Sequence, residues 1–251
     1  MEIILSVLFG LIIGSFLNVC IYRIPREESI VFPPSHCTNC GYELKPLDLI
    51  PVLSYIFLRG RCRKCKDKIS IKYPLIEILN AVLYLILFSK FGVSINFLFY
   101  AILTSLLIVT STIDIESKYV YNSTTIFGLI LGIVYIGVSY YFNHINVFNN
   151  ILGGVIGYLI IFLIVKLTNA MGEGDADIAG ICGLFIGIKG ILVALFLAVV
   201  IGGIMASIIL IFKIKDRKSE IAFSEYIAIG AFIWIVIGEK MLNFYFKIIG
   251  M

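Results

Sequence analysis

The sequence predicts an all-α polytopic membrane protein with about eight transmembrane helices and a small cytoplasmic loop that resembles a zinc ribbon. Of its 251 residues, 60% are hydrophobic and 14% are charged, and the mean hydropathy is +1.04. Soluble domains are about 45–50% apolar and about 25% charged. Apolar runs close to the ~20 residues of a membrane span recur along the chain. One polar segment interrupts them and carries two pairs of cysteines.

Each apolar run is expected to form one helical span. The expected spans, in chain order, are 3–22, 74–87, 97–113, 124–141, 151–168, 178–188, 191–212 and 221–237. The second and the sixth are short. The first run is interrupted by Gly14, Ser15 and Asn18 and has no small-residue cleavage site after it. We therefore expect a retained span there, not a signal peptide.

The positions of the basic residues predict the orientation. Ten of the 20 Lys and Arg residues lie between Arg23 and Lys72, four lie in the segment 213–218, and Lys118 follows Asp114. With eight spans and an outer N-terminus, all fifteen fall on one side. The positive-inside rule makes that side cytoplasmic. We expect a multi-pass protein of the cytoplasmic (inner) membrane.

Three regions follow from this pattern: a first transmembrane helix (1–22), a cytoplasmic zinc-binding loop (23–73) and a polytopic membrane domain (74–251). Four of the six cysteines lie in the loop, at Cys37, Cys40, Cys62 and Cys65. Two C-x-x-C pairs with 21 residues between them have the spacing of a tetrahedral Zn²⁺ site. Four protein ligands close the site, so the metal would be structural. The alternative is four free thiols in a solvated loop.

Two acidic segments end apolar runs on the predicted cytoplasmic side. Asp114 follows the third run, and Asp175 ends the sequence Gly-Glu-Gly-Asp at 172–175. A carboxylate at the end of a span is costly, which favours a functional role. Glu116 lies two residues after Asp114, and Asp177 lies two residues after Asp175. On a helix, the two acids of each segment would point to roughly opposite faces. Only one acid from each segment can then join a shared site, which we expect to consist of Asp114 and Asp175.

The two glycines of the 172–175 segment allow tight or positive-φ backbone and a close approach of another element. Glu77 lies one turn inside the second span, where it either caps the helix or lines a site. Two other functions stay open at this level. A proton- or cation-coupled transporter would use the intramembrane carboxylates, including Glu77, and a membrane-anchored interaction module would use only the cysteine loop.

The ordered set of motifs resembles the type IV prepilin peptidases, also called leader peptidase/N-methyltransferases, over nearly the whole chain. The matching segments are 14–25, the four loop cysteines, 50–55, 58–62, 73–77, Ile113-Asp114 and 172–175, the last as the GxGD motif.

The resemblance implies that Asp114 and Asp175 are the catalytic aspartates of a membrane aspartic endopeptidase. Such an enzyme removes the basic leader from prepilin or pseudopilin precursors at the cytoplasmic face and serves type IV pilus assembly and protein secretion. It implies a second step, N-methylation of the new N-terminus with S-adenosylmethionine, in a pocket near the zinc loop whose residues the sequence does not identify. Structural Zn²⁺, precursor peptides and membrane lipid are the expected ligands and partners, and nucleic acid is not expected.

Three positions depart from the family pattern. Asp177 stands where the family commonly has Lys, Val-Tyr-Asn at 120–122 where it usually has Leu-Pro-Asp, and Ala-Phe-Ser-Glu at 222–225 where it has Pro-Phe-Gly-Pro.

Overall fold

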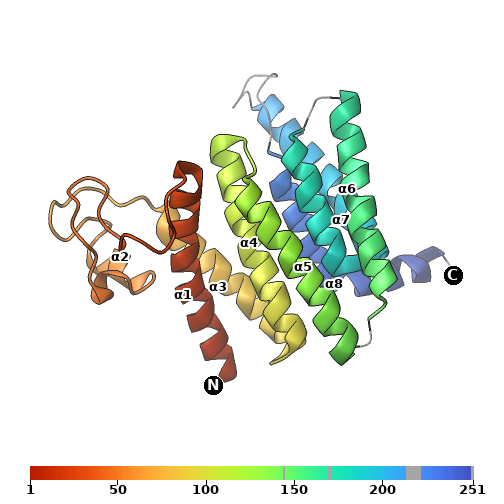
Figure 1. The fold of residues 1–251 in the computed structure, drawn as a ribbon, viewed down its shortest axis with the longest axis horizontal. Coiled ribbons are helices and arrows are strands. Elements are labelled where there is room, and N and C mark those ends of the chain that lie inside the picture. The colour runs from red at the N-terminus through yellow and green to blue at the C-terminus, as the bar shows by residue number, and fades with distance from the viewer. Residues whose placement is uncertain (144, 169–170, 213–221, 250–251) are drawn as a thin grey trace. The chain divides into compact units, whose positions relative to one another are not determined.

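The protein is described by a computed structural model that covers residues 1–143, 145–168, 171–212 and 222–249 (Figure 1). The basic segment 213–218 lies outside these residues. The helices are α1 (Glu2–Arg23), α2 (Leu53–Phe57), α3 (Lys72–Phe91), α4 (Ile95–Ser117), α5 (Asn122–Asn143), α6 (Val147–Thr168), α7 (Glu173–Ile211) and α8 (Ser224–Ile249). All except α2 are long and apolar enough to cross a membrane. The prediction of an all-helical membrane protein is confirmed.

Helix α7 contains two of the expected spans. A straight helix of its 39 residues would be about 58 Å long, nearly twice the ~30 Å hydrocarbon core. It is instead broken at Gly187, which has φ +67° and ψ −176°. A methyl group on Gly157 of α6 would lie 2.6 Å from the carbonyl oxygen of Ala179 and 2.8 Å from the side chain of Ile191. Since one glycine touches both sides of the break, the arms 173–186 and 188–211 fold back on each other.

The chain divides into two compact units, Met1–Val109 and Thr110–Met251. In the first unit, α1 packs closely against α3. A methyl group on Gly10 or Gly14 would lie 2.7 Å from the Cα atom of Ala81 or Glu77, respectively. This is the small-residue packing that lets membrane helices approach each other. The buried Asn80 side chain donates a hydrogen bond of 2.7 Å to the Gly10 carbonyl and joins the same two helices.

In the second unit, α7 lies between α6 and α8 (Figure 1). Glycines again allow the close approach. The backbones of Gly153 and Gly183 meet between α6 and the first arm of α7, and Gly230 of α8 meets the Ala194 backbone in the second arm. These backbone contacts pack α7 closely against α6 and α8. The acidic site described next involves the first turn of α7 and the start of α8.

Candidate active site and metal centre

Asp114 lies in the last turn of α4. The helix ends shortly after it because Lys118 adopts a left-handed conformation, with φ +57°, and donates its amide to the Asp114 carbonyl at 2.9 Å. The Asp114 side chain is buried, with 6% of its surface exposed. Its Oδ2 atom accepts a hydrogen bond of 2.6 Å from the Ser224 hydroxyl at the start of α8. The carboxyl group is therefore fixed by a residue 110 positions away in the chain.

Asp175 lies in the first turn of α7 and is 4% exposed. Its Oδ2 atom accepts the Gly172 amide at 3.2 Å, and its own amide donates to the Gly172 carbonyl at 3.1 Å. The close approach expected at the glycines occurs at Gly174, where a methyl group would collide with the Val120 side chain. The positive φ that glycine would allow is used at neither Gly172 nor Gly174.

The two predicted acids lie in one site. The carboxyl groups of Asp114 and Asp175 interact electrostatically, and the main chain of Ser224 also hydrogen-bonds to Asp175. Ser224 therefore contacts both acids and is itself fully buried. Of the neighbouring acids, Glu116 is exposed and Asp177 is half-buried. The helical spacing thus buries one acid from each segment.

The sequence pattern did not predict Ser224 as part of this site. It belongs to the 222–225 segment, which differs from the family pattern. A serine just before an apolar run is a helix-start signal, and that is the only local sign of its importance. Its contact with Asp114 depends on tertiary packing.

The four loop cysteines form one cluster. Their sulfur atoms all lie within 4.8 Å of one another, with Cys37 and Cys65 at 3.8 Å and Cys40 and Cys62 at 4.0 Å. A tetrahedral Zn²⁺ with bonds of about 2.3 Å would place its sulfur ligands about 3.8 Å apart. The donor set and its spacing therefore fit a four-thiolate metal site.

The two cysteine pairs sit in matching backbone turns. The Gly41 amide donates to the Cys37 carbonyl at 2.9 Å, and the Lys66 amide donates to the Cys62 carbonyl at 3.1 Å. Gly41 and Lys66 both have positive φ, +67° and +63°. Each turn is closed by a single β-bridge, His36 with Glu43 and Arg61 with Lys68. The repeat of one turn at both pairs explains how a loop with little regular structure brings four sulfur atoms together.

The pKa values of the Cys62 and Cys65 thiols are shifted in opposite directions. Hydrogen bonding from the Cys65 backbone amide, opposed by burial and helped by the Lys64 amide, lowers the pKa of Cys62 to about 7. The Asp67 amide favours the Cys65 thiolate, but burial and hydrogen bonds with the other three sulfur atoms raise the pKa of Cys65 to about 12. A divalent cation in the centre would favour the thiolate form of all four.

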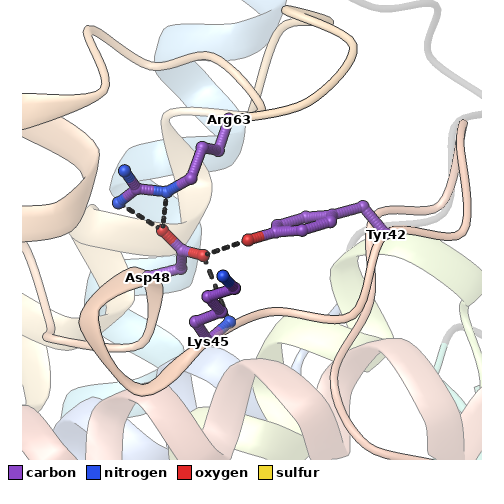
Figure 2. Close-up of polar contacts among 4 residues, drawn as sticks. All are labelled: Tyr42, Lys45, Asp48 and Arg63. Atoms are coloured by element: carbon purple, nitrogen blue, oxygen red, sulfur yellow. Dashed lines mark hydrogen bonds and ion pairs between the residues drawn. The ribbon is translucent and has the colours of Figure 1, made fainter.

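A buried carboxylate joins the two halves of the loop (Figure 2). Asp48 accepts hydrogen bonds from the Arg63 Nε atom at 2.7 Å, the Lys45 amide at 3.1 Å and the Tyr42 hydroxyl at 3.2 Å. Burial alone would raise the pKa of Asp48, but the bonds from Arg63 and Lys45 lower it below its ordinary value. Arg63 therefore pairs with Asp48, and this tie between the cysteine pairs was not foreseen from the sequence.

Comparisons with known proteins agree with this architecture. The profile described as "Bacterial Peptidase A24 N-terminal domain" matches residues 8–91, and that described as "Type IV leader peptidase family" matches residues 101–207. No solved structure matches.

Several curated relatives carry the name "Prepilin leader peptidase/N-methyltransferase". The protein from Bacillus subtilis (strain 168) is 30% identical over 242 residues, covering 96% of each chain. The one from Pseudomonas putida is 29% identical over 274 residues, covering 98% of this chain and 94% of the relative. The one from Neisseria gonorrhoeae is 30% identical over 239 residues, covering 83% and 82%. On this full-length similarity, the chain belongs to the type IV prepilin leader peptidase/N-methyltransferase family, whose peptidases form the A24 group.

Proposed function

We propose that this chain removes the basic leader from type IV prepilin-like precursors and that Asp114 and Asp175 are its catalytic pair. The observation that supports this assignment is the shared site itself, in which two buried carboxyl groups from different helices contact one serine. Burial of two acids together is costly in a membrane protein. Peptide hydrolysis by paired aspartates makes use of that arrangement.

Two carboxyl groups in one site do not both ionise readily, so their protons leave in two separate steps that belong to the pair. In the singly protonated state, the ionised aspartate takes a proton from a water molecule while the protonated one donates to the scissile carbonyl. The water then attacks the carbonyl carbon without a covalent acyl-enzyme. Ser224 donates to this pair and orients Asp114, which makes it a positioning residue.

We further propose that both acids and the cysteine loop face the cytoplasm. The basic residues between Arg23 and Lys72 support this orientation. Asp114 ends α4 and Asp175 begins α7, and with α5 and α6 crossing between them the two positions fall at the same membrane face. The substrate's apolar segment would then lie in the bilayer, and its basic leader would lie in the cytosol.

The cysteine cluster is proposed to hold a structural Zn²⁺ through Cys37, Cys40, Cys62 and Cys65. The sulfur spacing supports four-thiolate coordination. When bound, the metal supplies folding free energy to a loop that has a small apolar core. The chain itself contributes the two matching turns and the hydrogen bonds of Asp48 that link them.

The names of the relatives support a second activity, methylation of the amine that leader removal exposes. S-adenosylmethionine would supply the methyl group from its sulfonium centre. Both reactions are tested by incubating the purified enzyme with a prepilin and measuring the mass of the product. Leader loss gives the cleavage position, and one further methyl mass reports methylation.

The decisive variants are Asp114→Asn and Asp175→Asn, with Glu116→Gln as the control because Glu116 is exposed. Each aspartate variant should lose leader removal, while the control should retain it. Full processing by either aspartate variant would reject the pair. Proton flux through the wild-type protein without peptide cleavage would instead favour a transporter.

A further inference from the structure

A second polar site lies in the first unit. A cavity of about 370 Å³ opens between the ends of α1 and α3 and the cysteine loop. Its volume is in the range of pockets that bind small molecules. Glu77 lines it from α3, and Tyr22, Tyr55 and Tyr73 also line it. A cavity that contains tyrosine rings and a carboxylate is suited to a cationic ligand. The Tyr22 ring already carries the Arg26 guanidinium, 3.8 Å from the ring centre.

The Glu77 carboxyl group is fixed by burial and by two hydrogen bonds. It is buried, with 7% of its surface exposed. Its Oε2 atom accepts the Val52 amide at 2.7 Å, and the Ser15 hydroxyl also bonds to the carboxyl group. Val52 has φ +60° and ψ −49°, a costly conformation for a β-branched residue. Such strain persists where the surrounding structure enforces it, typically at functional sites.

The carboxyl group retains capacity for a ligand. An ionised carboxylate offers about four acceptor positions, and Val52 and Ser15 use two of them. Both of these donors are neutral, so they leave the negative charge of Glu77 uncompensated. A cation that enters the cavity would therefore meet a fixed carboxylate from which water is largely excluded, where the attraction is stronger than in bulk solvent.

The other charged or titratable groups around the cavity have partners or are exposed. His36 is exposed, and its Nδ1 atom lies 3.1 Å from the Pro34 carbonyl oxygen. Arg23 donates to the carbonyl oxygens of Ser29 at 2.8 Å and Pro33 at 2.6 Å. Asp48 and Arg63 pair with each other. Asp67 and Lys68 are exposed. Glu77 is thus the lining carboxylate best placed to attract a cation.

We propose that Glu77 binds the freed N-terminal ammonium group of the substrate in this cavity and takes its proton before methyl transfer. The inference rests on the methylation step of the proposed function. An α-amino group has a pKa of about 7.7–8.0 and is mostly protonated at neutral pH, when its nitrogen has no free electron pair. A positioned carboxylate removes that obstacle as a general base.

One proton passes from the ammonium nitrogen to the Glu77 carboxylate. The nitrogen electron pair then forms a bond to the methyl carbon of a sulfonium donor. At the same time the carbon–sulfur bond breaks, and the electrons of that bond stay on sulfur, which becomes a neutral thioether. The methylated amine leaves as a cation, and Glu77 returns its proton to water.

The test compares Glu77→Gln with wild type and uses Glu43→Gln as the matched control, because Glu43 is an exposed glutamate of the cysteine loop. Glutamine keeps the shape of the side chain and an oxygen that accepts the Val52 amide. Leader removal and the dissociation constant for labelled S-adenosylmethionine, measured by equilibrium dialysis, should stay within about twofold of wild type. Methylation near pH 6.5 should fall about 100-fold or more, as expected for loss of a general base.

The pH dependence separates this role from a merely structural one. Raising the pH from about 6.5 to about 9 deprotonates the amine without help, so the deficit of Glu77→Gln should shrink roughly 20-fold. A deficit that does not change with pH, or methylation equal to wild type at every pH, would overturn the proposal. If wild type removes leaders but never methylates them, the inference fails while the peptidase assignment stands.

Loss of leader removal by Glu77→Gln would show that this variant does not fold, and a second variant is then used. Glu77→Asp keeps a carboxylate and should methylate at a reduced rate with the pH profile of wild type. Leader removal by Glu77→Asp with no methylation at any pH would also overturn the proposal.

Discussion

Substitution of Ser224 by alanine tests the geometry of the aspartate pair without changing either acid. The Ser224 hydroxyl donates to Asp114 Oδ2 at 2.6 Å, and the serine is completely buried. A hydrogen bond to a charged group contributes about 1.5–3 kcal/mol net. Since about 1.4 kcal/mol corresponds to a factor of ten, Ser224→Ala should slow leader removal about 10- to 150-fold.

The assay is single-turnover cleavage of a prepilin in detergent micelles, measured by product mass.

Ser207→Ala is the matched control, since Ser207 is exposed and its hydroxyl donates to the Gly203 carbonyl one turn back in the same helix, at 2.8 Å. It should leave the rate of leader removal unchanged. If Ser224→Ala cleaves at the wild-type rate, the serine does not support the aspartate pair, and the role given to it here is wrong.

Three further outcomes are expected. Gly183→Ala should lower the unfolding free energy by about 1–3 kcal/mol, because the added methyl group meets the Gly153 backbone; thermal melts should show this, whereas Gly137→Ala, which enters open space, should not destabilise. Cys37→Ser should reduce bound zinc, measured by elemental mass spectrometry, because a four-thiolate site loses one ligand; undiminished zinc would argue against the cluster as its site. Asp48→Asn should speed the loss of zinc to a chelator. Because the pKa of Asp48 is lowered, its carboxylate is ionised at neutral pH. The faster zinc loss should therefore be constant between about pH 6 and 8.

Local patterns were sufficient to predict much of this protein. Apolar runs of membrane-spanning length identified the helices, since each span must satisfy its own backbone hydrogen bonds in lipid. The C-x-x-C spacing predicted the cysteine cluster because each pair of ligands comes from one short turn. The positions of Asp114 and Asp175 at the ends of apolar runs, together with the helical spacing of their neighbours, identified the two acids that the structure buries together.

Other features required the tertiary structure because they join residues that are distant in the chain. Ser224 meets Asp114 across 110 positions, and Glu77 meets Val52 across 25. Asp48 links the two cysteine pairs through its hydrogen bond with Arg63. The sequence shows two apolar runs around Gly187, but only the contacts of Gly157 with both arms show that the chain folds back there. Periodicity reports which face of a helix is apolar, whereas the partner of a polar side chain is decided by packing between helices.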